Sequence, residues 1–276
     1  MDAYTDVSYQ LSEQLTKRYS TSFSLSSSLF DRELRKHIYA IYGMVRIADE
    51  IVDTYRGNHA AAELEAFEKL TYDAVDKRFS TNPLLHAFAQ TAATFDIDKS
   101  LISPFFDSMR MDLTHTSFTE SEYNSYIYGS AEVIGLMCLK VFVHGDKKKY
   151  DQLTNGARAL GSAYQKVNFL RDFRADHENL GRCYFPGLTY EAFDETAKQK
   201  IIEDIRADFR EAEKTIPLLP KNARLAVQTS YRYYTRLLDL LDAAPVEKIK
   251  SDRLRLPNSR KLLTLVKARA KKVVRR

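Results

Sequence analysis

The sequence predicts an all-α fold, organised as a single-domain helical bundle, and three observations support this. Apolar residues recur every three to four positions along most of the 276 residues, as on helices with one buried face. The chain has only 9 Gly and 7 Pro, which fall mainly between these periodic segments. The alternation of apolar and polar residues that marks half-buried strands is nearly absent, since the segment LSSSLF is short and polar.

The periodic segments predict the helices in order along the chain. They are expected over residues 5–19, 31–54, 60–78, 84–95, 98–115, 119–143, 147–177, 191–216, 220–242 and 258–274. Asp31 stands where a short acidic side chain caps a helix. Pro104 is expected to kink or restart its helix, because proline lacks the backbone N–H. The run HENLGRCYFPG is expected to form a loop.

Composition predicts one domain over residues 1–276. Apolar residues make up 44% and charged residues 29%, and no Gly/Ser-rich or Pro-rich linker divides the chain. Cys138 and Cys183 are the only cysteines, which favours a reduced, cytoplasmic setting over a disulfide framework. The start MDAYTDVSYQ lacks the apolar core of a signal peptide, and no apolar run reaches the ~18 residues of a membrane span.

The net charge of +5 is unevenly distributed. Residues 250–276 hold eleven Lys or Arg and one acidic residue, Asp252, a charge of +10 that leaves −5 for residues 1–249. This basic C-terminal tail fits a terminal helix with a solvated basic face. Because Leu262, Leu263 and neighbouring residues are apolar, it also fits a helix that packs on the core or makes peripheral contact with a membrane. Nucleic acid is not an expected partner, because no nucleic-acid-binding motif accompanies the tail.

Two Asp-x-x-x-Asp pairs, Asp49–Asp53 and Asp172–Asp176, are the strongest functional signal. On a helix this spacing places both carboxylates on one face, one turn apart, where they repel unless a cation lies between them. Two such pairs facing one cavity would form a carboxylate site for hard divalent cations, which commonly hold phosphate groups.

Sequence context separates these two pairs from a third with the same spacing. Asp204–Asp208 lies within EDIRADFREAEK, where charges on all sides predict a solvated helix face. In contrast, Gln165 and Asn168 precede Asp172 at helical steps and extend the second pair into a polar stripe among apolar residues. Arg110 and Asp112, in SMRMDL, are expected to form a structural ion pair.

A string of motifs in fixed order resembles a known family. The motifs are YSTSFSLSSSLF, IYGMVRIADEIVD, SMRMDL, YIYGSAEVIGLM, LGSAYQKVNFLRDFRAD, GRCYFP, YRYYTRLLDLL and RLRLPNSRKL, which together span almost the whole chain. They resemble the squalene/phytoene synthase family of head-to-head trans-isoprenoid synthases, most of all its bacterial phytoene synthases. The resemblance implies an isoprenoid-synthase bundle around a central apolar cavity.

The resemblance also implies a reaction. Two geranylgeranyl diphosphates would condense 1′-1 to phytoene through a cyclopropyl diphosphate, with release of pyrophosphate, as the first step of carotenoid biosynthesis. The alternative is squalene or dehydrosqualene from two farnesyl diphosphates, and NADPH would be needed only for squalene. Mg²⁺, or Mn²⁺ in its place, would neutralise the leaving diphosphate. The oligomeric state is left open.

The family's site residues carry over by motif. Mg²⁺ is expected to bind at Asp49, Asp53, Asn168, Asp172 and Asp176. Tyr126 and Tyr234 are expected to act in catalysis together with the four aspartates. Residues expected to contact the substrate or its diphosphate are Ser20, Ser22, Tyr42, Arg46, Gln165, Arg171, Arg182 and Tyr184. Departures from the commoner family pattern occur at Tyr19, Val45, Glu132 and Ile134, which leaves the shape of the cavity open.

Two other functions compete with a head-to-head synthase. A terpene cyclase or a chain-elongating prenyltransferase could use a similar helical fold, but elongating enzymes typically carry DDxxD, and neither acidic motif here begins with two adjacent Asp. A non-catalytic helical assembly subunit would carry its acidic pairs on the surface. The alignment of Asn168, Asp172 and Asp176 on one helix face argues against that alternative.

Overall fold

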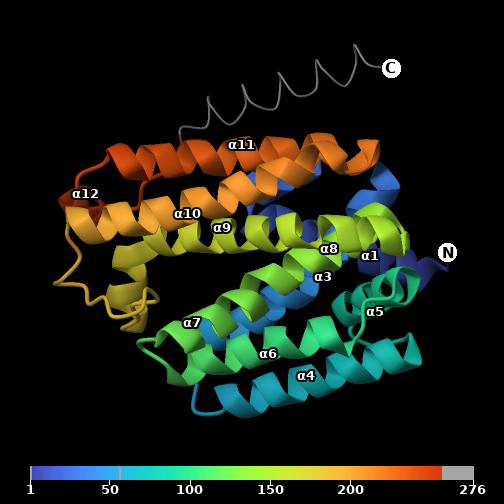
Figure 1. The fold of residues 1–276 in the computed structure, drawn as a ribbon. Helices are drawn as coiled ribbons and strands as arrows, with labels where there is room; N and C mark the ends of the chain where they lie inside the picture. The colour runs from blue at the N-terminus through green and yellow to red at the C-terminus, as the bar shows by residue number, and fades with distance from the viewer. Residues whose placement is uncertain (1, 56, 257–276) are drawn as a thin grey trace.

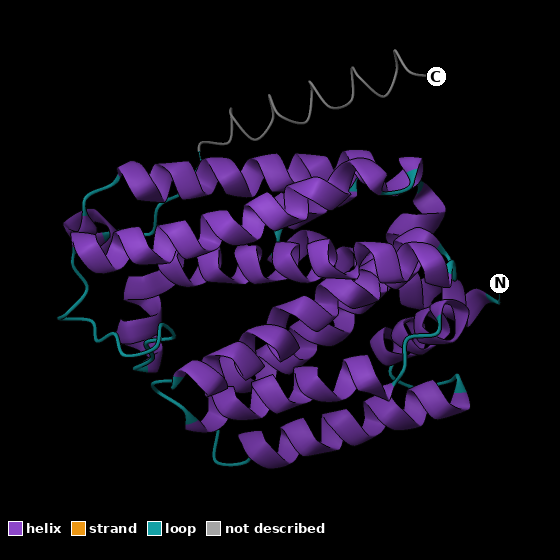
Figure 2. Cartoon of the chain, in the orientation of Figure 1, coloured by secondary structure: helices purple, strands orange, loops and turns teal. Residues whose placement is uncertain are grey.

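The structure is a computed structural model that describes residues 2–55 and 57–256, apart from the side chains of Thr21 and Ser22. Within these ranges every regular element is helical, which confirms the predicted fold class (Figures 1 and 2). The elements are α1 (Ala3–Tyr19), α2 (Thr21–Ser27), α3 (Arg32–Asp49), η1 (Glu50–Tyr55), α4 (Ala60–Lys77), α5 (Pro83–Phe95), α6 (Lys99–Thr114), α7 (Glu120–Ile127), η2 (Tyr128–Glu132), α8 (Val133–Val143), α9 (Lys147–Leu180), α10 (Glu195–Thr215), η3 (Ile216–Leu218), α11 (Lys221–Ala243) and α12 (Val246–Ser251).

Two short helices, α2 and α12, were not predicted from the sequence. α2 is rich in serine, which is a weak helix former in a helix interior. It forms because Ser20 is its N-cap, with the Ser20 hydroxyl accepting a bond from the Phe23 N–H at 3.3 Å. α12 begins after Pro245 and buries Val246 and Ile249 against the bundle. Its six residues are too few to show a helical period in the sequence.

Two long predicted helices contain π-helical segments. Residues 31–54 divide into α3 and the π-helix η1, and residues 119–143 form α7, the π-helix η2 and α8. Such segments are frequently found at functional sites. Asp31 does occupy the N-cap position of α3, but its side chain makes no capping bond to the first turn.

The expected restart of the helix at Pro104 and the expected loop start at His177 were both wrong. α6 continues through Pro104, which removes a single backbone donor from the helix. α9 continues to Leu180, where Gly181 ends it with φ 64°. That left-handed conformation costs glycine nothing.

α9 is the central element of the bundle. It contacts α8 and η2 on one side and α10, α11 and α12 on the other (Figure 1). The helices approach closely where glycine replaces a side chain. A Cβ at Gly161 of α9 would lie 2.5 Å from the Ala131 carbonyl oxygen of η2, and one at Gly129 would lie 1.9 Å from the Pro104 carbonyl oxygen of α6. These contacts hold η2 tightly between α6 and α9.

One stretch, Glu120–Val143, is long and apolar enough to cross a membrane by length and composition. The sequence analysis passed over it because polar residues interrupt its apolar run. In the structure 56% of its most apolar window is buried within the fold, as expected for a core helix of a bundle.

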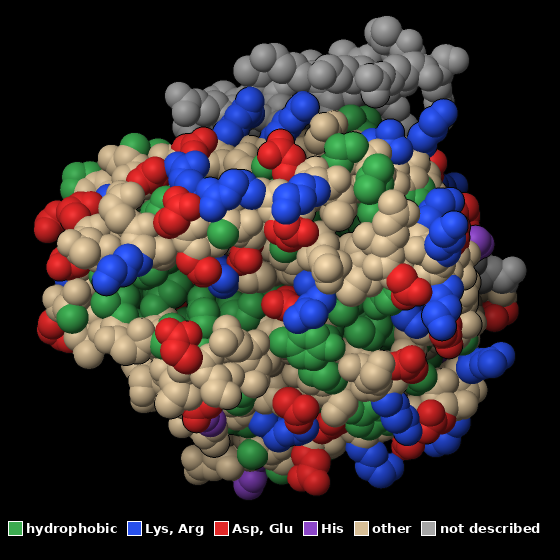
Figure 3. Space-filling model, in the orientation of Figure 1, with side chains coloured by type: hydrophobic (Ala, Val, Ile, Leu, Met, Phe, Trp, Pro, Cys, Tyr) green, Lys and Arg blue, Asp and Glu red, His purple; other side chains and the backbone are tan. Residues whose placement is uncertain are grey.

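The basic C-terminal tail is described only in part. Leu256 is buried and Leu254 packs beside it against the apolar cluster around α9 and α10. The predicted helix over 258–274 lies outside the described residues. On the face seen in Figure 3, acidic and basic side chains are interspersed around a recessed band of apolar side chains.

Gly129→Ala is expected to destabilise the protein by about 1–3 kcal/mol, because the new methyl group would overlap the Pro104 backbone. Urea denaturation measures the change. Gly43→Ala is the matched control, since a Cβ there meets the Ser12 side chain at an ordinary 3.4 Å. It should leave stability unchanged or raise it by up to about 1 kcal/mol through helix propensity. Equal losses from the two variants would contradict the close approach of η2 to α6.

Candidate active site

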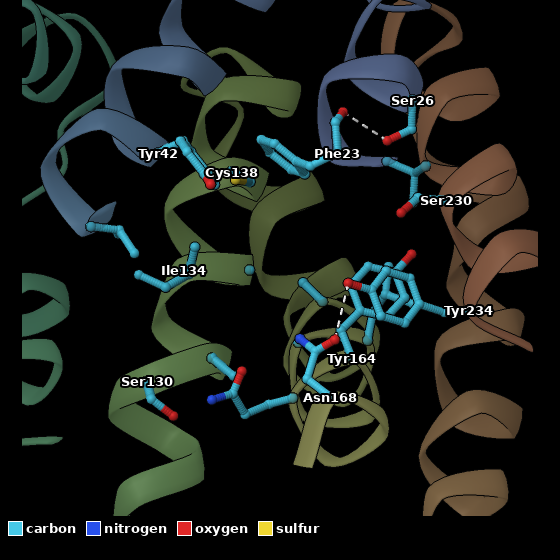
Figure 4. A pocket seen from close by; sticks show the side chains of 18 of the residues that line it. Phe23, Ser26, Tyr42, Ser130, Ile134, Cys138, Tyr164, Asn168, Ser230 and Tyr234 are labelled. Atoms are coloured by element: carbon cyan, nitrogen blue, oxygen red, sulfur yellow. Dashed lines mark hydrogen bonds between the residues drawn. The ribbon is translucent and has the colours of Figure 1, made fainter. Parts of the chain in front are cut away.

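A cavity of about 550 Å³ runs through the bundle. One face each of α3, α8, α9 and α11 lines it. On α9 the lining positions are 153, 156, 157, 160, 161, 164, 165, 168, 169, 171, 172, 176 and 180, which follow the three- and four-residue steps of one helix face. In Figure 4, Tyr42 and Cys138 lie toward the left of the cavity and Ser230 lies toward the right.

The two ends of the cavity differ in chemistry. One end carries the carboxylates of Asp49, Asp53, Asp172 and Asp176 together with three guanidinium groups, those of Arg46, Arg171 and Arg253. The far end is apolar, and its wall includes Phe30, Leu139, Phe142, Leu153, Ile216 and Leu219. The cavity can therefore hold a hydrocarbon chain whose charged head lies among the carboxylates and arginines.

The first acidic pair sits where α3 passes into η1. Asp49 is the last residue of α3 and Asp53 lies in the π-helix, so the pair does not share one regular helix, although both residues line the cavity. Arg46, one turn earlier, lies 3.7 Å from Asp49 and also pairs with Glu50. Its guanidinium stacks 4.6 Å from the ring centre of Tyr19, and its buried Nε has no hydrogen-bond partner.

The second acidic pair extends along α9 as the sequence predicted. Gln165, Asn168, Asp172 and Asp176 all line the cavity. Asp172 accepts hydrogen bonds from Arg171 at 3.0 Å and forms an ion pair with the Nε of Arg253 at 2.6 Å. Arg253 follows α12, so the C-terminal end of the described chain reaches this site.

Tyrosines form the wall between the two ends. The Tyr234 hydroxyl donates to Asn168 Oδ1 at 3.5 Å, and the Tyr234 ring stacks on Tyr164 with ring centres 4.0 Å apart (Figure 4). Tyr42 stacks on Phe23 with ring centres 5.2 Å apart. Since these rings face the cavity, they present aromatic faces to whatever chain fills it.

A buried network behind the first pair was missed by the sequence analysis. Asp112 accepts bonds from the hydroxyls of Tyr126 at 2.9 Å and Tyr184 at 3.1 Å. It also pairs at 3.1 Å with Arg182, whose side chain is only 1% exposed. Arg182 in turn donates to Asp53 at 3.2 Å. The network thus holds one carboxylate of the first pair in place.

The expected ion pair between Arg110 and Asp112 was therefore wrong. Two residues apart on a helix, the two side chains point in different directions. Arg110 pairs with Glu68 and Asp107 at the surface, whereas Asp112 faces the interior and pairs with Arg182.

Burial and neighbouring carboxylates oppose the ionisation of two of these aspartates. Burial, and secondarily the charge of Asp53, raise the pKa of Asp49 to about 7. Burial and the charge of Asp172 raise the pKa of Asp176 to about 8. Asp49 keeps a partly exposed side chain because it faces the cavity. A cation bound at this end would stabilise both carboxylates and lower both pKa values.

The donor set fits a hard divalent cation. It consists of carboxylate and amide oxygens, the ligands Mg²⁺ prefers. Among residues 2–55 and 57–256, no three acidic, His or Cys side chains converge closely enough to hold an ion alone. That is compatible with Mg²⁺, which usually takes one or two carboxylates and completes its shell with water and substrate phosphates.

Burial raises the pKa of Tyr126 and of Tyr184 well above the ordinary value, and the charge of Asp112 adds to the rise. Both phenols are therefore protonated at neutral pH. They act as hydrogen-bond donors to Asp112, not as bases.

Most of the predicted site residues line this cavity, and Ser20 and Arg182 do not. Ser20 caps α2. The prediction for Ser22 is not tested, because its side chain lies outside the described part of the chain. Arg182 forms ion pairs with Asp53 and with the buried Asp112. Its predicted contact with diphosphate therefore stays a prediction. Lining residues that the sequence analysis missed include Ser26, Asp112, Ser230 and Arg253. The motif RLRLPNSRKL, which begins at Arg253, was the one signal in the sequence for this residue.

The four residues that depart from the commoner family pattern have two kinds of surroundings. Val45 and Ile134 line the cavity and so affect its shape. Glu132 pairs with Arg158 at 2.5 Å, and Tyr19 covers Arg46, so these two positions act on neighbouring side chains.

The third acidic pair is not simply a solvated face. Asp204 and Asp208 lie 2.6 and 2.9 Å from the ammonium of Lys166, a buried residue of α9, and Asp208 also accepts a bond from Ser162. The pair therefore joins α10 to α9, away from the cavity. One lysine ammonium thus contacts both carboxylates of this pair.

An all-helical bundle with carboxylates and arginines at one end of an apolar cavity defines a class of protein that binds hydrocarbon chains with anionic heads. The family profile of squalene/phytoene synthases matches residues 16–260. The chain belongs to the squalene/phytoene synthase family. It is therefore a prenyltransferase of the family that condenses prenyl diphosphates head to head.

Individual relatives agree with this assignment. Chloroplastic phytoene synthase 1 of tomato (Solanum lycopersicum) is 30% identical over 96% of this chain and 68% of its own length. The 4,4′-diapophytoene synthase of Staphylococcus haemolyticus is 27% identical over 72% of this chain and 70% of its own. Among solved structures, a ligand-bound dehydrosqualene synthase has the same fold, with a TM-score of 0.82 at 19% identity over 98% of both chains.

Arg182→Met is expected to cost about 3–5 kcal/mol of stability, because it leaves the buried Asp112 without its partner. Arg110→Met is the matched control. It breaks exposed pairs and should cost less than about 1 kcal/mol. Chemical denaturation of both variants measures the difference, and equal losses would refute the assignment of Arg182 as the partner of Asp112.

Proposed function

We propose that this protein condenses two geranylgeranyl diphosphates to phytoene. The first half of the reaction forms a cyclopropyl diphosphate and releases one pyrophosphate and one proton. The second half ionises that intermediate, releases a second pyrophosphate and ends with loss of a proton. The observation that carries the choice of a C20 substrate is the length of the cavity.

The cavity is longer than a C15 chain needs. Asp172 and Leu153 both line it and lie 19 residues apart on α9, which is about 28 Å along the helix axis. An extended carbon chain advances about 1.3 Å per bond, given C–C lengths near 1.5 Å. A geranylgeranyl chain with 15 main-chain bonds then spans about 19 Å, and a farnesyl chain with 11 spans about 14 Å. The longer chain fills the apolar part and leaves room for its diphosphate.

The relatives support the same choice. The tomato phytoene synthase aligns with 96% of this chain, and the diapophytoene synthase aligns with 72%. The alternative, squalene or dehydrosqualene from two farnesyl diphosphates, would leave the far end of the cavity unfilled. Squalene would in addition require NADPH as the reductant.

The charged end of the cavity is proposed to bind the diphosphates. Arg46, Arg171 and Arg253 present guanidinium groups there, which match phosphate oxygens in geometry and charge. Asp49, Asp53, Asn168, Asp172 and Asp176 are proposed to hold Mg²⁺, which when bound stabilises the negative charge of the leaving diphosphate. In the described structure Arg171 and Arg253 engage Asp172, so these arginines already lie where the diphosphate would arrive.

The apolar walls are proposed to protect the carbocation left after ionisation. Water would quench that cation, and the apolar side chains beyond Asn168 exclude it. The faces of Tyr42, Tyr164 and Tyr234 can stabilise the passing positive charge without reacting with it.

Product analysis tests the substrate. With Mg²⁺ the purified protein is expected to convert geranylgeranyl diphosphate to phytoene, with two pyrophosphates released per product, whether or not NADPH is present. Farnesyl diphosphate should be used at least about tenfold less efficiently, because its shorter chain buries less apolar surface. Squalene formed only from farnesyl diphosphate and NADPH would overturn the proposal.

Asp53→Ala and Asp172→Ala are each expected to lower turnover by at least about a thousandfold, because each removes a proposed metal ligand that stabilises the leaving group. Circular dichroism should show unchanged helicity. Asp204→Ala is the matched control, since the same spacing there serves Lys166, and its turnover should stay within about twofold. Near-normal turnover in Asp53→Ala or Asp172→Ala would refute the metal assignment.

Metal affinity is expected to rise with pH. The raised pKa values of Asp49, about 7, and Asp176, about 8, mean that both groups hold protons at pH 6 that Mg²⁺ must displace. Without metal, the folded state loses stability as pH rises from about 4 through 8, because the unfolded carboxylates ionise more readily. The Mg²⁺ concentration that gives half of the maximal thermal stabilisation should fall at least about tenfold between pH 6 and 8.5. A pH-independent value, or an unchanged profile in the Asp49→Asn, Asp176→Asn double variant, would contradict this.

A further inference from the structure

Two ring contacts join the N-terminal segment to α3. Tyr19, the last residue of α1, covers the guanidinium of Arg46, whose Cζ lies 4.6 Å from the centre of the ring. Phe23 of α2 stacks on Tyr42, with ring centres 5.2 Å apart. Residues 19 and 23 therefore contact positions 46 and 42, which lie one turn apart on α3. The Phe23–Tyr42 contact lines the cavity, whereas Tyr19 does not line it and reaches it through Arg46.

Arg46 uses its N–H groups unequally. Its Nη1 lies 3.7 Å from Asp49, and its Nη2 donates a hydrogen bond to Glu50. Its Nε is buried and has no hydrogen-bond partner among the described residues. Because buried donors are nearly always paired, an unpaired Nε on a side chain that lines the cavity points to a bond that a ligand completes.

We infer that Tyr19 is a positioning residue, which holds the Arg46 guanidinium so that its unpaired Nε edge is presented to the diphosphate. The inference rests on the proposed function, because that function places a diphosphate at this end of the cavity. It goes further in giving a role to a residue that does not itself line the cavity.

Stacking suits this role because a ring covers only the face of a guanidinium. The five N–H groups lie in the guanidinium plane, so they stay available to phosphate oxygens. A carboxylate in place of the ring would instead occupy N–H groups that the diphosphate needs. The ring also restricts a long side chain that Asp49 and Glu50 attract along their own helix segment.

Tyr19 can be replaced with little effect on the core, and α1 offers a matched control. The Tyr19 side chain is 48% exposed, so its removal uncovers little apolar surface. Tyr4 on the same helix is 37% exposed. Its ring lies against Phe79 and His86, with ring centres 5.9 and 4.8 Å away. Replacing Tyr4 therefore removes an exposed tyrosine from α1 without touching Arg46.

The test measures the dissociation constant of inorganic pyrophosphate in the presence of Mg²⁺, by isothermal titration calorimetry on the full chain. Tyr19→Leu is expected to weaken binding at least about fivefold, which is the scale of one cation–π contact. Tyr19→Phe keeps the ring and should bind within about twofold of the wild type. Tyr4→Leu should also stay within about twofold, because no guanidinium depends on that ring.

Dependence on Arg46 separates positioning from a general effect on the helix. In the Arg46→Gln background, Tyr19→Leu should weaken binding by less than about twofold more, because the group that it positions is gone. The same fold-loss from Tyr19→Leu in both backgrounds would overturn the inference. Wild-type affinity in Tyr19→Leu would do so as well, as would a loss of the same size in Tyr19→Phe or in Tyr4→Leu.

Pyrophosphate binding also separates this inference from the proposed function. The measurement needs neither a prenyl chain nor turnover, so it tests Tyr19 even if wild-type protein forms no phytoene. Wild-type protein that forms phytoene, with pyrophosphate affinity that Tyr19→Leu leaves unchanged, would refute the role of Tyr19 alone. Wild-type protein that binds no pyrophosphate with Mg²⁺ would also refute it, since Arg46 would then have no anion to meet.

Discussion

The repulsion among carboxylates at one end of an otherwise apolar cavity is the constraint on which the rest of this structure depends. Asp49 and Asp176 have strongly raised pKa values because burial and neighbouring acids oppose their ionisation. A fold that served stability alone would pair or remove such groups. Here the surrounding bundle holds them in place, and they are relieved only when a cation or proton arrives. A site of this kind suits an enzyme that must bind and then release a highly charged diphosphate.

The two acidic pairs are held by different parts of the scaffold. α9 carries the whole second acidic stripe on one uninterrupted helix. Lys166 of α9 forms ion pairs with Asp204 and Asp208 of α10. The first pair lacks that regularity, because α3 passes into a π-helix between Asp49 and Asp53. Its support comes instead from Arg182 and Asp112 beneath it. The two acidic pairs are thus held beside the cavity by different interactions.

The cavity exists because helices that are close at some points are kept apart at others. Gly129 and Gly161 let η2 lie against α6 and α9, while tyrosines and phenylalanines line the cavity between the helices. One face of α8 lines the cavity. Other residues of α8, namely Val133, Met137 and Val141, are buried in the hydrophobic core. The side chains that shape the apolar part of the cavity are thus separate from the carboxylates and guanidinium groups at its other end.

The sequence by itself determined the all-α class, most helix positions, the Gln165–Asn168–Asp172–Asp176 stripe and the family. Helical periodicity and local spacing are properties of neighbouring residues, so the chain displays them directly. Only the tertiary structure decided which charges meet across the fold. Asp112 pairs with Arg182 from a loop far along the chain, Arg253 arrives from beyond α12, and Asp204–Asp208 finds Lys166. Phe30 and Phe142 meet only because separate turns gather at one end of the bundle. Contacts of this kind depend on how helices pack, and local sequence carries no record of that.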